Sequence, residues 1–113
     1  MAFKLVIGNT VQVKVAGYYT DEKGVKRKFD FTLDMDRMDQ DELKAALTTR
    51  TEDATETVRR LARGWNGQRL VLTEDDKPAD FSPEAMDKLM TISGMGGHCW
   101  QAYLAVVMVN EKN

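Results

Sequence analysis

Two stretches of alternating apolar and polar residues, joined by a short turn, are the sequence feature that most constrains this fold. Over residues 11–16 valine occupies every second position, and over residues 25–33 the odd positions are apolar except for Arg27. Successive side chains of a strand point to opposite faces, so each stretch predicts a strand with one apolar and one polar face. The turn at residues 21–24, Asp-Glu-Lys-Gly, joins the two strands into an antiparallel β-hairpin.

An isolated hairpin is only marginally stable in water, so other parts of the chain must cover its apolar face. Residues 70–72, Leu-Val-Leu, form an apolar run of strand length. Two arrangements stay open: this segment pairs beside the hairpin as a third short strand, or the hairpin packs directly on helices. Residues 3–7 are expected to add a first strand piece or to begin a longer strand that bends at Gly8.

Capping patterns and helical spacing predict two helices in the middle of the chain. Asp39, with Glu42 three residues later, is a capping-box variant that opens a helix to about residue 48, with Leu43, Ala46 and Leu47 inward. A second box at residues 49–52 opens the next helix, which is expected to end at Gly64 in the left-handed conformation. Its apolar stripe follows helical spacing and comprises Ala54, Val58, Leu61, Ala62 and Trp65.

A third helix is predicted to begin at Ser82-Pro83. Serine is a favoured N-cap, and proline suits the first helical position because its missing N–H needs no partner there. Phe81 is placed to form a hydrophobic staple with Met86. The helix is expected to run to about residue 92, until Gly94, Gly96 and Gly97 break it, with an inward face of Met86, Leu89 and Met90.

The last predicted helix, from about residue 98 to 109, is apolar around nearly its whole circumference. Ala102, Ala105, Val106 and Val109 cover much of the surface outside its predicted core face. Such a helix is either wholly buried or partly covered by a partner, and a short chain seldom buries its own terminal helix completely. The predicted core face comprises Trp100, Tyr103, Leu104, Val107 and Met108.

Together these elements predict one α+β domain over residues 1–113, since this length suits a single domain. Its architecture is an N-terminal antiparallel β-hairpin, with or without a third short strand, packed on about four α-helices.

Charge and cysteine content narrow the classes of partner. The formal net charge of −2 gives no overall attraction to nucleic acid or to anionic membranes. The single cysteine, Cys99, cannot form an internal disulfide, which favours a reducing compartment. The chain lacks both a signal-peptide pattern and the apolar run of about 18 residues that spans a membrane. We therefore expect a soluble cytoplasmic protein with no membrane partner.

No residue pattern indicates catalysis, a metal or a cofactor. The aspartates between residues 34 and 41 lack the glycine and glutamate of a calcium loop, so they are read as acidic residues at a helix N-terminus. His98 and Cys99 are adjacent and would point about 100° apart on a helix, so they cannot form a nucleophile–base pair alone. The glycines at 94–97 follow a helix and lack the lysine of a phosphate-binding loop. The protein is expected to act by binding.

Four arginines form a candidate polar contact face near the end of the second helix: Arg59, Arg60, Arg63 and Arg69. Acidic neighbours such as Glu56 dilute their field, so a solvated face is favoured over nucleic-acid binding. A basic face that binds an acidic protein segment is a further option.

The most distinctive stretch of the chain begins with Leu-Ala-Arg-Gly-Trp-Asn-Gly at residues 61–67. A short segment with an acidic turn follows, Phe-Ser-Pro-Glu at 81–84 opens a helix, and the last helix carries Trp100, Ala102 and Tyr103. In these features the chain resembles the tail assembly chaperones of long-tailed bacteriophages and prophages. The resemblance runs from about Leu61 to Tyr103 and is only topological before that.

The resemblance implies a non-enzymatic protein that binds the largely helical tape measure protein, self-associates, and delivers its client to the growing tail tube, whose protein is a further partner. It also implies work in the host bacterial cytoplasm and absence from the mature virion. Alternatives are a structural tail component, such as a tube or terminator subunit, and a small nucleic-acid-binding regulator. Client binding and self-association are assigned to the last helix and its glycine-rich approach: Met95, Trp100, Tyr103, Leu104, Val106, Val107 and Met108.

Overall fold

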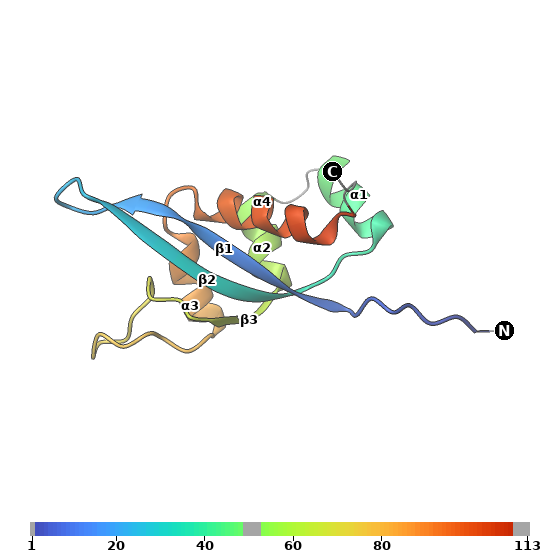
Figure 1. Cartoon of the computed structure of the whole chain (residues 1–113), viewed down its shortest axis with the longest axis horizontal. Coiled ribbons are helices and arrows are strands. Elements are labelled where there is room, and N and C mark those ends of the chain that lie inside the picture. Colours follow the sequence, from blue (N-terminus) through green and yellow to red (C-terminus); the bar gives the residue numbers. More distant parts are fainter. Residues whose placement is uncertain (1, 49–52, 110–113) are drawn as a thin grey trace.

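The computed structural model describes residues 2–48 and 53–109 and confirms the α+β class (Figure 1). A long antiparallel sheet runs along the molecule, and helices pack on one face of it. The elements in chain order are β1 (Thr10–Thr20), β2 (Lys26–Asp36), α1 (Gln40–Thr48), α2 (Ala54–Leu61), β3 (Ala62–Asn66), α3 (Pro83–Met90) and α4 (Met95–Val107).

The predicted hairpin is confirmed as β1 and β2, which pair along their full length from Thr10 opposite Asp36 to Thr20 opposite Lys26. Asp21 closes the turn, because its side chain accepts hydrogen bonds from the N–H groups of Lys23 and Val25, both at 2.9 Å. These bonds, with that from Arg27, lower the pKa of the Asp21 carboxyl. The inward face of the hairpin is buried, as its alternation predicts, at Val13, Val15, Phe31, Leu33 and Met35.

A third strand does pair with the hairpin, but the segment predicted for it was wrong. β3 lies beside β2 and is formed by the residues expected to end the second helix; Trp65 stands opposite Leu33. The predicted left-handed helix end at Gly64 is also wrong, since Gly64 lies within β3 and packs against Asp34. Pairing with the exposed edge of β2 outweighs the helical spacing of this segment. Residues 70–72 contribute only an isolated bridge between Leu72 and Pro78.

Residues 3–9 form an N-terminal arm that extends from the body of the molecule (Figure 1). The strand expected at residues 3–7 was wrong: these residues are not paired with the sheet, and their apolar side chains are exposed. The root of the arm is held where the carbonyl of Asn9 accepts a hydrogen bond of 2.7 Å from the N–H of Arg37.

The first two helices begin at aspartate caps. The predicted box of α1 is confirmed, because Asp39 and Glu42 each accept a hydrogen bond from the other's backbone N–H, at 2.9 and 3.2 Å. Leu43 is buried as expected, but Leu47 is 41% exposed, which corrects its inward assignment. The second predicted box, at 49–52, lies outside the described residues, and the N-cap of α2 is Asp53.

The predicted start of α3 is confirmed: Ser82 Oγ accepts a hydrogen bond of 3.0 Å from the N–H of Ala85, and Pro83 opens the helix. Its three predicted inward residues, Met86, Leu89 and Met90, are buried. Phe81 makes an edge-to-face contact with Trp65 at 5.2 Å between ring centroids. This contact ties the start of α3 to β3.

The last helix begins earlier than its sequence suggests. Gly94 is its N-cap and adopts a left-handed φ of 82°, while Gly96 and Gly97 lie inside the first turn of α4. A helix can contain these glycines because α4 packs closely on α2 and on β1, and this packing supplies the stability that glycine lacks. The buried residues of α4 are Met95, Gly96, Cys99 and Tyr103.

Candidate binding surfaces

An apolar cleft lies between the tip of the hairpin and the loop that follows β3, and we call it the tip cleft. Its volume is about 760 Å³, which falls within the size range of protein ligand sites. It is lined by Tyr18 and Tyr19 of β1, which are 61 and 41% exposed, and by Leu72 of the loop, which is 47% exposed. Ile92 and Met95, from the junction of α3 and α4, line it also. The cleft therefore joins three parts of the chain that are far apart in sequence.

The loop side of the tip cleft is held in place by one buried side chain, Gln68. Its Oε1 accepts hydrogen bonds from the N–H groups of Leu70 and Val71 at 3.0 and 2.8 Å. Its Nε2 donates to the carbonyls of Val71 and Ala79 at 2.9 and 3.0 Å. All four hydrogen bonds of an amide are thus satisfied inside the loop. Nothing in the sequence singles out this residue, because a glutamine after an Asn-Gly turn looks like an ordinary surface residue.

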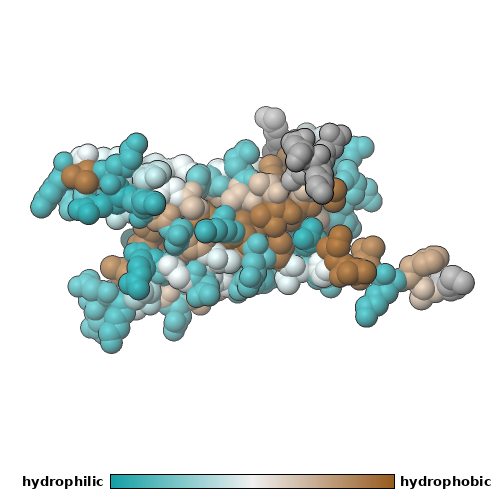
Figure 2. Space-filling view, viewed as in Figure 1, coloured by the Kyte–Doolittle hydropathy of each residue, from teal (hydrophilic) through white to brown (hydrophobic). Residues whose placement is uncertain are grey.

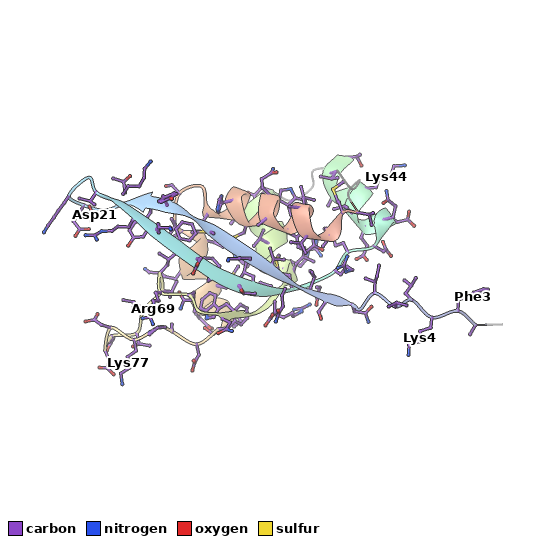
Figure 3. All side chains as sticks on the ribbon, in the orientation of Figure 1. Phe3, Lys4, Asp21, Lys44, Arg69 and Lys77 are labelled. Carbon is purple, nitrogen blue, oxygen red and sulfur yellow. The ribbon has the colours of Figure 1, made fainter. Side chains whose placement is uncertain are left out.

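Charged side chains lie on the two segments that border the tip cleft. Figure 3 labels Asp21 at the hairpin tip and both Arg69 and Lys77 on the loop after β3. Arg69 lines the cleft, and the ammonium of Lys26 lies over the ring of Tyr18, 5.6 Å from its centroid. The rim is therefore polar while the lining is largely apolar, a pattern common to protein-binding sites.

A second apolar hollow of about 400 Å³ lies between α1 and the end of α4, and we call it the α1–α4 groove. Met38, Leu43, Leu47, Val107 and Met108 contribute to its apolar lining, and its charged lining residues are Asp39 and Lys44. Leu47 and Met108 are 41 and 46% exposed. The root of the arm is next to this groove, since Asn9 bonds to Arg37, the neighbour of Met38.

The seven residues predicted for partner binding do not share one surface. Met95 and Tyr103 are buried; Met95 lines the inner part of the tip cleft, whereas Tyr103 packs in the core. The Tyr103 hydroxyl accepts a hydrogen bond from the N–H of Met38 and donates to the carbonyl of Asp36, so it anchors α4 to the end of β2. Trp100 and Leu104 are half-buried, and Val106 is 41% exposed. Val107 and Met108 line the α1–α4 groove.

The predicted arginine face is divided among separate interactions. Arg59 pairs with Asp87 at 2.8 Å, and Arg63 pairs with Asp36 of β2. The contact with Asp36 raises the pKa of the Arg63 guanidinium. Arg60 also has an interaction within the chain, and Arg69 lies at the tip cleft. Two of the four charges are therefore balanced by carboxylates and do not form a continuous basic track.

His98 and Cys99 have different surroundings. His98 Nε2 lies 2.6 Å from the carbonyl oxygen of Ala16, and its ring contacts Phe29 edge-on. The thiol of Cys99 is fully buried, and this burial raises its pKa to about 12. The neutral thiol packs in the core and lacks the thiolate character of a nucleophile.

The buried thiol gives a first testable prediction. Native protein at about pH 8 should react with Ellman's reagent only as fast as it unfolds, whereas protein in concentrated urea should react at once. Because the folded pKa lies above that of the unfolded thiol, the contribution of Cys99 to stability is complete below about pH 9 and is lost as the pH rises toward 12. Rapid labelling of the native protein would contradict this placement.

Two further features bear on the classes of function. Within residues 2–48 and 53–109, no three His, Cys, Asp or Glu side chains are grouped so as to hold a metal ion. No helix in the same part of the chain is long and apolar enough to cross a membrane. Comparison of the chain with protein-family models, with curated proteins and with solved structures gave no match.

Proposed function

We propose that this protein is a non-enzymatic phage tail assembly chaperone, which binds apolar helical segments of the tape measure protein and self-associates in the host cytoplasm. The observation that carries the proposal is the tip cleft, a large apolar hollow with exposed aromatic and aliphatic side chains. The resemblance of residues 61–103 to tail assembly chaperones supplies the identity of the client.

The tip cleft suits the apolar face of an amphipathic helix. In this mode of recognition, side chains spaced along one helix face enter a hydrophobic groove. Tyrosines contribute a large apolar surface and a polar hydroxyl at low cost in conformational entropy. Tyr18 and Tyr19, on neighbouring positions of β1, bring such surface to the cleft and its rim.

Methionine adds adaptability to this surface. Its unbranched side chain can repack around differently shaped apolar partners. Met95 is 4% exposed and lines the inner part of the cleft. It can therefore adjust beneath a client without being itself a surface residue. A long helical client presents many related apolar segments, and an adaptable cleft would accept more than one of them.

Co-expression with a helical tape measure fragment tests the proposal. The fragment should stay soluble with the wild-type protein and should aggregate without it. Leu72→Asp places a charge on an exposed cleft residue and should abolish this protection. Val106→Asp is the matched control, since Val106 is similarly exposed but lies on α4 outside the tip cleft.

The variants also separate this proposal from its alternatives. Loss of protection by Val106→Asp alone would place the client on α4, the face first inferred from sequence, and would overturn the cleft assignment. A wild-type protein that leaves the fragment insoluble would overturn the chaperone function itself. Presence of the protein in purified virions would favour a structural tail component instead.

A further inference from the structure

We propose that the N-terminal arm of one copy docks in the α1–α4 groove of a second copy, and that the exchange is mutual. The proposal rests on the self-association in the proposed function and names the segment that performs it. The arm carries four large apolar side chains, Phe3, Leu5, Val6 and Ile7, which are 91, 82, 101 and 55% exposed.

Such a segment is costly to leave in water. Scattered exposed apolar residues are normal, but a contiguous apolar segment held away from the body marks a contact site. Figure 2 shows the apolar arm at one end of the molecule, beyond the body, and Figure 3 shows Phe3 and Lys4 on it. The arm therefore has the character of a ligand that the described residues of its own chain leave exposed.

The α1–α4 groove matches the arm in its apolar character. Its apolar lining comprises Met38, Leu43, Leu47, Val107, Met108 and Val109, the last of which is 95% exposed. Two lining residues are charged, Asp39 and Lys44. The single charged side chain of residues 3–9 is Lys4. An apolar arm with one cation thus meets a mainly apolar groove whose two charged lining residues are of opposite sign.

The position of the arm root favours a second copy with two-fold symmetry. Asn9 is bonded to Arg37, and the next residue, Met38, lines the groove, so root and groove lie at the same end of each molecule (Figure 1). Two copies that meet at this end around a two-fold axis can each place an arm in the other's groove, which closes the assembly. Two arms and two grooves supply apolar surface on the order of the 1,000 Å² that a specific interface requires.

The test compares the mass of wild-type and variant proteins by sedimentation equilibrium across a concentration series. The wild type should be a dimer. Leu5→Ser/Val6→Ser should weaken dimerisation at least a hundredfold, because polar side chains replace apolar ones in both arms. Val25→Ser, at an exposed valine in the hairpin turn at the other end of the molecule, should leave the dimer unchanged. A monomeric wild type, or an arm variant that keeps the dimer mass, would overturn the proposal.

A cross-link identifies the groove and distinguishes exchange from docking within one chain. Val6→Cys/Met108→Cys should oxidise to a disulfide-linked dimer on a non-reducing gel, and the buried Cys99 will not interfere. A disulfide formed within one chain would overturn the exchange, as would failure to link while the wild type dimerises. Tyr18→Cys in place of Met108→Cys is the control pair, since Tyr18 lies at the hairpin tip and should not link to the arm.

The solubility of the tape measure fragment distinguishes a failure of the arm-exchange proposal from a failure of the proposed chaperone function. The tip cleft is lined by none of the arm residues, so the monomeric Leu5→Ser/Val6→Ser variant should still keep the tape measure fragment soluble. The arm exchange can therefore be wrong while the chaperone activity is confirmed. Equally, the chaperone activity can be wrong while the arm exchange is confirmed.

Discussion

Gly96→Ala is expected to lower the free energy of unfolding by about 3 kcal/mol, the upper part of the range for overpacking a well-packed interior. A Cβ at residue 96 would overlap Thr55 Oγ1 and would lie 2.9 Å from Thr55 Cα. The side chain of Thr55 could rotate away, but its Cα belongs to the backbone of α2. The two helices would have to separate, and their contact holds the centre of the helical layer.

Gly97→Ala is the matched control for this prediction. Gly97 lies in the same turn of α4, but a Cβ there would meet no atom within 4 Å. Replacing a helical glycine by alanine in open space should raise stability by up to about 1 kcal/mol. Urea denaturation followed by circular dichroism measures both changes. Equal stability of the two variants would show that α2 and α4 do not approach as closely as Gly96 indicates.

Partial rescue provides a second check. Thr55→Ala in the Gly96→Ala background removes the overlap with Oγ1 and leaves the approach of the two backbones. The double variant should recover part of the lost stability, because contacting residues deviate from additivity. If the stability changes of the two substitutions were fully additive, the stability lost in Gly96→Ala would not arise from its contact with Thr55.

The sequence predicted those elements whose signals are local. The hairpin follows from the alternation of apolar and polar residues on both sides of the Asp-Glu-Lys-Gly turn. Asp21 closes that turn through hydrogen bonds to residues at most four positions away. The starts of α1 and α3 follow from Asp39 and Ser82, whose side chains bond to N–H groups three residues on. In each case the partners are neighbours in the chain, so the pattern of residues contains the interaction.

The errors fall where distant segments decide the structure. Ala62 and Trp65 continue the helical stripe of Val58 and Leu61. They form β3 only because they pair with the open edge of β2. The early start of α4 depends on the closeness of α2 at Gly96, which glycine content alone does not reveal. The pattern of residues 3–7 suits a strand, but these residues pair with no strand in the part of the chain that the structure describes.

The candidate binding surfaces were predicted only in part, for the same reason. The apolar circumference of α4 correctly indicated buried contacts, but α2 and β1 supply them on the side of Met95 and Tyr103. The apolar residues near the end of the helix are Val107 and Met108, and they form a groove only together with α1. The tip cleft likewise exists because the hairpin tip and the loop after β3 lie on either side of the α3–α4 junction.

Gln68→Met should lower the free energy of unfolding by about 3–4 kcal/mol, although the two side chains have similar size and shape. The variant leaves two N–H groups without the Gln68 oxygen, that of Leu70, which is half-buried, and that of Val71, which is buried, at about 1–3 kcal/mol for each unpaired donor. The carbonyls are less affected, because Val71 still accepts from the N–H of Ala79 and Ala79 still accepts from Trp65 Nε1. Gln101→Met, on an exposed turn of α4, should change stability by less than about 0.5 kcal/mol.

Gln68→Glu separates the two kinds of hydrogen bond at this site. A carboxylate still accepts from Leu70 and Val71, but its second oxygen faces the carbonyls of Val71 and Ala79 in place of a donor. The stability lost should therefore shrink in acid, where the protonated carboxyl can donate one hydrogen bond. Denaturant midpoints of variant and wild type at several pH values measure this. A loss that is the same at every pH would show that Gln68 Nε2 contributes little to the loop, and hence that the loop side of the tip cleft is held chiefly by the Oε1 contacts.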